Sequence, residues 1–301
     1  MNSFNESSFF FDLSNNTAYD SWRARKLDGY PLEVQSLVVN ISDFQNPTNS
    51  EVEAMRENIT KTNMTFYKCK TDMGFDVRRA KDALNSLGLH MGFKTRDPNL
   101  CADEDSYSIL SVTEDDQKNR YIPYTNKPIN WHTDGYYNPG YKKVLGMGLH
   151  CISPAAVGGE NALLDPEIIY IFLRDENPDF VQALMHPRAM EIPANVVAEN
   201  DIRPVQTGPV FSLFGDDATL HMRYTARTRS IKWRQDEVTK AALRFLRNIL
   251  KKGCPYIFRR RLEPGEGILC NNVLHNRTGF EDDNVQQRCF LRTRYFDRIT
   301  K

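Results

Sequence analysis

The chain has 301 residues, and its 39 lysines and arginines balance its 39 aspartates and glutamates. A chain without net charge has no overall field that draws it to nucleic acid or to an anionic membrane, so neither is expected as a partner. Hydrophobic residues make up 40% of the chain, which is enough for a substantial core. The six cysteines show no CxxC pairing, and we interpret them as reduced thiols.

The sequence predicts a cytoplasmic protein of one domain. Residues 1–16 have no basic residue before their Phe-Phe-Phe run and no long apolar stretch, which argues against a secretory signal. No window approaches the length of a membrane span. No Gly/Ser linker, low-complexity run or repeat marks a boundary. We therefore expect a single domain over 1–301, in which residues 1–120 carry no recognisable motif and pack on a motif-bearing portion, 121–301.

Helices are predicted from capping residues and helical periodicity. The first begins with a capping-box pattern, Ser50 to Glu53, and the third begins with a cap and a first-turn proline, Asp165-Pro166. The last has its apolar side chains on one side. The predicted helices cover residues 50–62, 76–87 with Gly88 ending the helix, a segment that begins at Asp165, and 235–252.

Strands are predicted from apolar or alternating runs. A Gly-Asp-Asp turn after 209–214 predicts a hairpin with 219–224. The predicted strands cover residues 107–112, 144–152, 209–214, 219–224, 256–261, 267–275 and 288–296. The fold class is therefore mixed α and β and rich in β, with helices outside a β core.

A histidine followed two positions later by a carboxylate occurs in His132-Thr133-Asp134. In extended backbone, side chains at i and i+2 leave the same face, so these two could hold one side of a metal ion. On the tripeptide alone, a turn histidine next to an aspartate that accepts a backbone hydrogen bond is the simpler interpretation. The case for a metal therefore depends on residues further along the chain.

A turn and strand over 264–279 supply another histidine, His275, and Arg288 and Arg292 follow on the next predicted strand. Two histidines and one carboxylate form the facial triad that suits non-haem Fe(II), which leaves positions open for a chelating cosubstrate and dioxygen. An arginine beyond the second histidine can bind a carboxylate through two hydrogen bonds.

Together, the HxD motif, the distant histidine and the RxxxR pattern resemble the Fe(II)/2-oxoglutarate-dependent dioxygenases of the taurine dioxygenase (TauD/TfdA-like) and clavaminate synthase-like family. The resemblance covers roughly residues 124–298. It implies a double-stranded β-helix, or jelly roll, with flanking helices. It also implies that His132, Asp134 and His275 bind Fe(II) and that 2-oxoglutarate is the cosubstrate.

The same resemblance implies roles for residues that bind the organic ligands. Arg288 would take the distal carboxylate of 2-oxoglutarate, and Arg292 would lie nearer the iron and the primary substrate; the alternative is that both arginines face water. Asn161 stands where the family usually has Thr or Ser to help hold 2-oxoglutarate, and its amide can also donate a hydrogen bond. Arg223 is a candidate substrate contact, with a solvated hairpin as the alternative.

Other histidines compete with His275 for the third ligand position. His221 is the main competitor, although no RxxxR pattern follows it at suitable range. His150 lies in an apolar strand, where a core histidine is the simpler interpretation. The competing histidines are His90, His150, His186 and His221.

We therefore predict an oxygenase that hydroxylates an unactivated C–H bond of a small carboxylated metabolite or amino acid derivative, with release of succinate and CO2. Its partners are the small-molecule substrate and O2; the sequence leaves a homo-oligomer open. Alternatives are a desaturase or cyclase on the same scaffold, a jelly-roll binding protein without turnover, and a zinc hydrolase. Hydrolysis leaves the RxxxR pattern unexplained.

Overall fold

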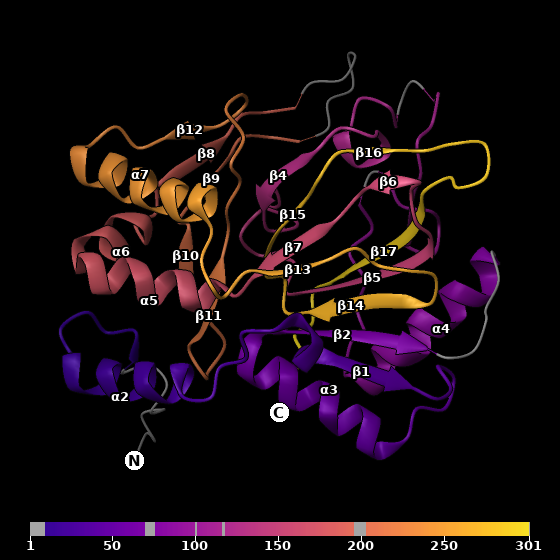
Figure 1. Ribbon diagram of the computed structural model, residues 1–301. Helices are drawn as coiled ribbons and strands as arrows, with labels where there is room; N and C mark the ends of the chain where they lie inside the picture. The colour runs from indigo at the N-terminus through magenta and orange to yellow at the C-terminus, as the bar shows by residue number, and fades with distance from the viewer. Residues whose placement is uncertain (1–9, 70–75, 100, 116–117, 196–202, 301) are drawn as a thin grey trace.

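The computed structural model describes residues 10–69, 76–99, 101–115, 118–195 and 203–300. A six-stranded sheet and a four-stranded sheet form the centre of the molecule (Figure 1). The six-stranded sheet has the order β1 (Val38–Ile41), β2 (Met64–Cys69), β14 (Glu266–Cys270), β5 (Gly146–Ser153), β17 (Cys289–Tyr295) and β3 (Ser108–Leu110). The four-stranded sheet has the order β13 (Phe258–Arg260), β7 (Asn161–Leu164), β15 (Leu274–Arg277) and β4 (Ile129–His132).

Smaller sheets and the helices surround this centre. The small sheets are β10 (Phe211–Phe214) with β11 (Thr219–Met222), β12 (Lys232–Trp233) with β8 (Met190–Ile192) and β9 (Gln206–Gly208), and β16 (Phe280–Glu281) with β6 (Val157–Gly158). The α-helices are α2 (Asn16–Leu27), α3 (Asn49–Thr62), α4 (Val77–His90), α5 (Pro166–Glu176), α6 (Pro178–Leu184) and α7 (Glu237–Lys252), with 3-10 turns at Val34–Leu37 and Ile122–Tyr124. The mixed, β-rich class expected from the sequence is confirmed.

The strand β17 sorts its side chains between the two faces of the six-stranded sheet. Leu291 and Tyr295 pack with α3 and α4, which cover the outer face (Figure 1), and Tyr295 stacks on Phe93 with ring centroids 4.1 Å apart. Because successive strand residues point to opposite faces, Arg292 and Arg294 point inward. There Arg292 lies near Asp134, which follows β4 of the other sheet. The chemistry-bearing side chains therefore lie between the two sheets.

One predicted strand is wrong in a way that matters for the site. Residues 267–275 were expected to form a single strand, but β14 ends at Cys270 and β15 begins at Leu274 in the other sheet. The corner is made by Asn272, whose φ of 48° is left-handed, a conformation that asparagine tolerates better than most residues. Asn271 and Asn272 interrupt the apolar run at this corner, and the strand prediction passed over that signal. The corner carries His275 into the four-stranded sheet.

The other predicted elements differ mainly at their ends. The capping box of α3 is made by Thr48 and Glu51, two residues before the expected pair. α4 begins after Asp76 as expected but continues through Gly88, which was expected to end it. A Cβ on Gly88 would lie 3.0 Å from the Tyr295 hydroxyl oxygen, so this glycine permits a close helix-to-sheet approach. The predicted hairpin is confirmed as β10 and β11.

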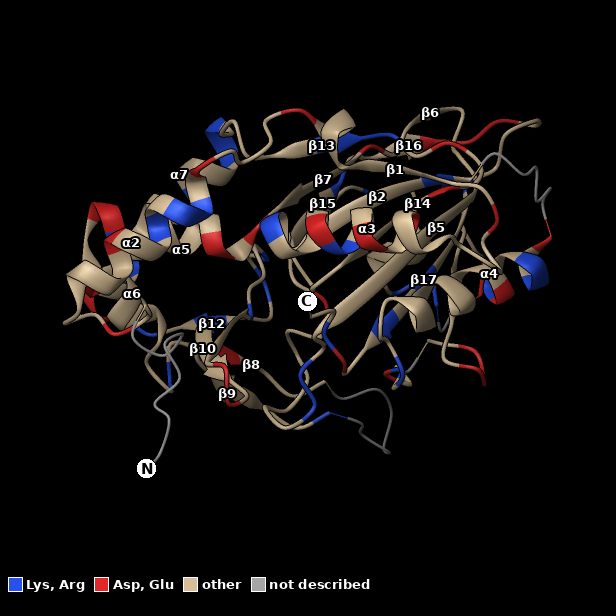
Figure 2. Ribbon diagram, turned by 90° about the horizontal axis from the view of Figure 1, so that it is seen from below, with Lys and Arg blue, Asp and Glu red and all other residues tan. Residues whose placement is uncertain are grey.

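Charged residues of both signs lie along the outer helices, as Figure 2 shows for α3 and α7. On α7 the leucines Leu243, Leu246 and Leu250 are buried, while the lysines at its end are exposed. None of the helices in the described part of the chain has the length and apolar character needed to cross a lipid bilayer.

Candidate active site

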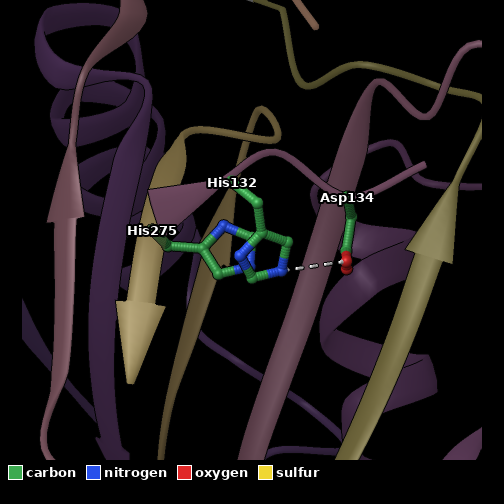
Figure 3. A group of neighbouring side chains, drawn as sticks. All are labelled: His132, Asp134 and His275. Carbon is green, nitrogen blue, oxygen red and sulfur yellow. Dashed lines mark ion pairs between the residues drawn. The ribbon is translucent and has the colours of Figure 1, made fainter. Parts of the chain in front are cut away.

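His132, Asp134 and His275 come together at the inner end of β4 (Figure 3). His132 and His275 are direct partners across the antiparallel pair β4–β15, and their ring centroids lie 4.2 Å apart. His132 Nε2 is 3.8 Å from Asp134 Oδ1. One ligand atom from each of the three side chains lies within 4.8 Å of the others. This is a donor set of two imidazole nitrogens and one carboxylate oxygen, which suits a divalent metal ion such as Fe(II).

Both imidazole rings are oriented by a backbone carbonyl two residues earlier. His132 Nδ1 is 2.9 Å from the Asn130 oxygen, and His275 Nδ1 is 2.9 Å from the Val273 oxygen. A carbonyl can only accept, so each Nδ1 carries the proton and each Nε2 has a free lone pair. The register between β4 and β15 is irregular next to this pair, between His275 and Arg277. Such carbonyl contacts fix the tautomer and the direction of metal-binding histidines.

Asn272 holds the backbone of Asp134 in place, and the sequence analysis missed it. Its Oδ1 accepts from the Asp134 backbone N–H at 2.8 Å, and its Nδ2 donates to the carbonyls of Asp134 and Val144 at 2.9 and 2.7 Å. Asn272 therefore ties the β14–β15 corner to the loop after β4. The Asn-Asn pair at a break between two apolar runs was the available signal.

The electrostatics of the three side chains favour their metal-binding protonation states. Burial, with a smaller contribution from the neighbouring His275, lowers the pKa of His132 to about 3, and burial also lowers the pKa of His275. Burial alone would raise the pKa of the Asp134 carboxyl, but the guanidiniums of Arg292 and Arg294 outweigh it, and the pKa lies below its ordinary value. Near neutral pH the site therefore presents two neutral imidazoles and one carboxylate. Asp134 Oδ2 is buried and has no hydrogen-bond partner.

Arg288 and Asn161 are buried at the far end of the same interior. Arg288 is 3% exposed, and burial lowers its pKa to about 10. Its guanidinium lies 3.9 Å from the centroid of the Phe290 ring, and its Nε and Nη1 have no hydrogen-bond partner. The Asn161 Nδ2 is also buried without a partner. The alternative in which Arg288 faces water is wrong.

Arg292 and Arg294 lie closer to the triad. Arg292 Nη1 is 3.4 Å from Asp134 Oδ1, which is a loose contact, and its Nε has no partner. Arg294 has partners of its own: it forms an ion pair with Asp97, and its Nη1 donates to the Tyr137 hydroxyl at 2.7 Å. The Nε of Arg294 is also without a partner, but its other two nitrogens are used by Asp97 and Tyr137, whereas Arg292 has only the loose contact to Asp134 and keeps donors for a ligand beside the metal.

Arg223 was expected to contact substrate, but in the structure its side chain binds backbone carbonyls. Its guanidinium donates to the backbone carbonyls of Tyr136, Gln206 and Met190 at 2.6, 2.9 and 3.5 Å. These bonds brace the segment after the HxD motif against β8 and β9. A substrate contact by Arg223 stays a prediction that these contacts do not support, and the alternative of a solvated hairpin residue is also wrong for this half-buried side chain.

The competing histidines lie outside the triad. His221 is on β11 beside Phe214, with ring centroids 6.2 Å apart. His150 is in the core and shares a hydrogen bond of 3.0 Å with the Tyr67 hydroxyl. His90 Nδ1 is 2.9 Å from the Ser86 carbonyl, and His186 Nδ1 accepts from the Arg188 backbone N–H at 3.0 Å. In the part of the chain that the structure describes, no other group of three potential ligands comes together.

A family profile decides the class of protein. The profile described as "Taurine catabolism dioxygenase TauD, TfdA family" matches residues 71–294. The chain belongs to this family. It is an Fe(II)- and 2-oxoglutarate-dependent dioxygenase. The match begins well before residue 124, where the motif-based resemblance started, so the family's pattern extends into the N-terminal portion.

Curated relatives and solved structures agree with this assignment. Uridine-5'-phosphate dioxygenases from Streptomyces sp and Amycolatopsis sp are each 27% identical to the chain, over 206 and 170 residues. The alignments cover 65% and 55% of this chain and 72% and 60% of those proteins. The structure of an asparagine oxygenase with Fe(II), 3-hydroxyasparagine and succinate is similar with a TM-score of 0.55, 14% identity, and coverage of 82% of this chain and 84% of that one.

A second similar structure is the non-heme iron oxygenase OrfP, in complex with Fe, succinate and (3S)-hydroxy-L-Arg. It has a TM-score of 0.61 and 14% identity, and the match covers 83% of this chain and 81% of that chain. At this level of identity the likeness shows the fold. Both solved complexes contain iron and succinate, the product of 2-oxoglutarate.

Proposed function

We propose that this dioxygenase hydroxylates a C–H bond of a small anionic metabolite, with 2-oxoglutarate as cosubstrate and succinate and CO2 as the other products. The observation that carries the proposal is the alignment, in one interior, of the His132–Asp134–His275 triad with buried arginines that have unused donors. We also infer that the two central sheets form the double-stranded β-helix of the family, with 1–301 as a single domain.

His132, Asp134 and His275 are proposed to hold Fe(II). When bound, the iron and its cosubstrate supply the oxidising chemistry that activates O2 toward an unreactive C–H bond. The chain contributes the geometry: two carbonyls aim the imidazoles, and Asn272 fixes the Asp134 backbone. The intact triad favours turnover over a binding protein without activity.

Arg288 is proposed to bind the distal carboxylate of 2-oxoglutarate. It is buried, it has two unpaired donor atoms, and it forms no ion pair among the described residues. A buried guanidinium without an anionic partner is costly, so a carboxylate ligand is the expected partner. Asn161, with a buried and unpaired amide nitrogen, is proposed to donate to the same cosubstrate.

The primary substrate is proposed to carry an anionic group that pairs with Arg292. Asp134 Oδ1 contacts the Arg292 guanidinium only loosely, at 3.4 Å from Nη1. The Nε of Arg292 has no hydrogen-bond partner. The relatives named for uridine-5'-phosphate make a phosphorylated nucleoside one candidate, and the amino-acid oxygenases among the solved structures make a carboxylated amino acid another. Both classes offer an anion to Arg292.

Two measurements test the proposal. Fe(II) and 2-oxoglutarate added to the anaerobic protein should produce the weak visible charge-transfer band of an iron-bound 2-oxo acid, which neither a zinc hydrolase nor a protein without this site would give. Succinate formation should then be measured with nucleoside 5'-monophosphates and amino acids, and with matched compounds that lack the anion, the nucleosides and the amino acid amides. Absence of the band would refute 2-oxoglutarate as cosubstrate, and stimulation by the compounds without a phosphate or carboxylate alone would refute the anionic substrate.

A further inference from the structure

Three buried side chains with unused hydrogen-bond donors form one wall beyond the triad. They are Asn161 on β7, Arg277 on β15 and Arg288 just before β17, which are 7%, 4% and 3% exposed. Asn161 Nδ2, and the Nε and Nη1 of both arginines, have no hydrogen-bond partner. Arg277 has no role in the proposals made so far.

These donors are close to one another and to the triad. Asn161 and Arg277 are direct partners across the antiparallel pair β7–β15, so their side chains leave the same face. Both guanidiniums lie against the Phe280 ring, with Arg277 4.8 Å and Arg288 5.1 Å from its centroid. Arg277 is two residues beyond His275 on the same face, an advance of about 6.6 Å along the strand. That distance is comparable to the length of a five-carbon dicarboxylate that chelates a metal at His275.

Several other cations in the described interior have carboxylate partners. Lys26 pairs with Asp165 and Glu167, Arg294 pairs with Asp97, and the half-buried Arg260 donates to both oxygens of the buried Glu266. Within the described residues, neither Arg277 nor Arg288 forms an ion pair with a carboxylate. The two guanidiniums contact the same Phe280 ring without a carboxylate beside them, so an anion that accepts from both would offset their repulsion and their lost hydration.

Arg277 also connects this wall to the strand that carries His132. Its Nη2 donates to the backbone carbonyls of Thr125, at 2.9 Å, and of Lys127, in the segment that leads into β4. Both carbonyls bind Nη2, and Nε and Nη1 are left without a hydrogen-bond partner. An anion that accepts from Nε or Nη1 would therefore hold the Arg277 side chain in the position where it also binds the segment before β4.

We propose that Arg277 is a second guanidinium for the distal carboxylate of 2-oxoglutarate, beside Arg288 and with the Asn161 amide as a further donor. The assignment rests on the proposed function, because it takes 2-oxoglutarate as the ligand of this wall. In this proposal Arg277 determines specificity, because it favours 2-oxo acids that have a second carboxylate. The same side chain binds the Thr125 and Lys127 carbonyls, so cosubstrate binding would also stabilise the segment before β4.

The test compares two chelators on the full-length protein loaded with Mn(II). 2-Oxoglutarate has a distal carboxylate, and oxalate chelates the metal through two oxygens without one. Arg277→Gln should weaken 2-oxoglutarate binding by about ten- to a hundredfold, measured by calorimetry, because a charge-assisted contact is lost. Its affinity for oxalate and for Mn(II) should stay at the wild-type value. Asn161→Ala should show the same selectivity with a loss of about two- to tenfold, because it removes a neutral donor.

Two variants separate ligand binding from folding. Arg277→Lys keeps the charge and a donor, so it should recover most of the 2-oxoglutarate affinity that Arg277→Gln loses. Arg259→Gln removes an exposed guanidinium from the same sheet and should change neither affinity. If Arg277→Gln fails to fold, Arg277→Lys and Asn161→Ala are compared with the wild type instead. The deciding quantity is again the affinity for 2-oxoglutarate relative to the affinity for oxalate.

The outcomes are distinct. Equal weakening of 2-oxoglutarate and oxalate would show that Arg277 acts only through the Thr125 and Lys127 carbonyls and would overturn the proposal. Unchanged 2-oxoglutarate affinity in Arg277→Gln, with normal wild-type binding, would overturn it while leaving the proposed function intact. A wild-type protein that binds Mn(II) and oxalate but no 2-oxoglutarate would overturn both.

Discussion

Arg288 and Arg294 lie at opposite ends of one strand segment and are equally buried, at 3% and 2% exposure, yet their surroundings are opposite. Arg294 has Asp97 and the Tyr137 hydroxyl as partners. Burial would lower its pKa, but Tyr137, Asp134 and Asp97 outweigh burial and raise it. Arg288 has no carboxylate partner in the described chain, and burial lowers its pKa to about 10. The two arginines therefore differ in one respect: Arg294 has a counter-ion within the fold, and Arg288 has none among the described residues.

His221 and His275 also differ in their neighbours. This difference gives the largest expected effect. Burial lowers the pKa of His221 to about 3, as it does for His132, so the pKa does not identify a ligand. The neighbours do, because only His275 stands with His132 and Asp134. His275→Ala and Asp134→Ala should abolish substrate-dependent succinate formation and stoichiometric iron binding. His221→Ala is the control and should keep both; loss of iron in His221→Ala with retention in His275→Ala would reverse the ligand assignment.

The comparison of the two arginines predicts opposite effects on stability. Arg294→Met should leave the buried Asp97 carboxylate without its partner, which typically costs about 3–5 kcal/mol of unfolding free energy. Arg288→Met should cost much less or even stabilise the ligand-free protein, because it removes an unpaired buried charge. Urea unfolding of both variants without metal or cosubstrate measures the difference. Equal destabilisation would mean that Arg288 has a structural role like that of Arg294.

The sequence predicted the candidate ligands better than it predicted the residues that position them. The candidate ligands belong to motifs that can be recognised even where a strand is predicted with the wrong ends. His132, Asp134 and His275 come together in the structure, and Arg288 is buried. Asn272 was missed because it acts through backbone groups of Asp134 and Val144, whose proximity depends on the corner between β14 and β15, and the predicted strand ran through that corner.

The fold shows the same division between pattern and context. α7 and the β10–β11 hairpin follow from periodicity and turn residues, and both are confirmed. α2 was not predicted, because its sequence is mostly polar and it is anchored by tertiary contacts: Lys26 pairs with Asp165, and the Tyr19 hydroxyl donates to Asp175 at 2.6 Å. Such contacts join segments far apart in the chain and leave no local signal.

The binding of 2-oxoglutarate gives a third test of the comparison between Arg288 and Arg294. Arg288→Gln should weaken 2-oxoglutarate binding by about ten- to a hundredfold, because it removes charge-assisted hydrogen bonds in a desolvated site. The expected change is in the cosubstrate concentration that half-saturates the anaerobic charge-transfer band. The matched Arg294→Gln variant, if folded, should shift that concentration much less, since Asp97 and Tyr137 already use its guanidinium. Unchanged 2-oxoglutarate affinity in Arg288→Gln would mean that the distal carboxylate does not bind to Arg288.

Arg292 lies between the two cases, and it gives the smallest expected effect. It has a partner, Asp134, but the 3.4 Å separation and the unpaired Nε leave part of its donor capacity unused. If that capacity serves an anionic group of the primary substrate, Arg292→Gln should reduce the acceleration of succinate formation by substrate about tenfold, the lower end of the loss expected for a contact to a charged group. The measurement compares succinate production with and without the best substrate from the screen, after 2-oxoglutarate binding has been shown to persist. Full stimulation in the variant would mean that Asp134 is the sole partner of Arg292 and that the substrate anion binds elsewhere.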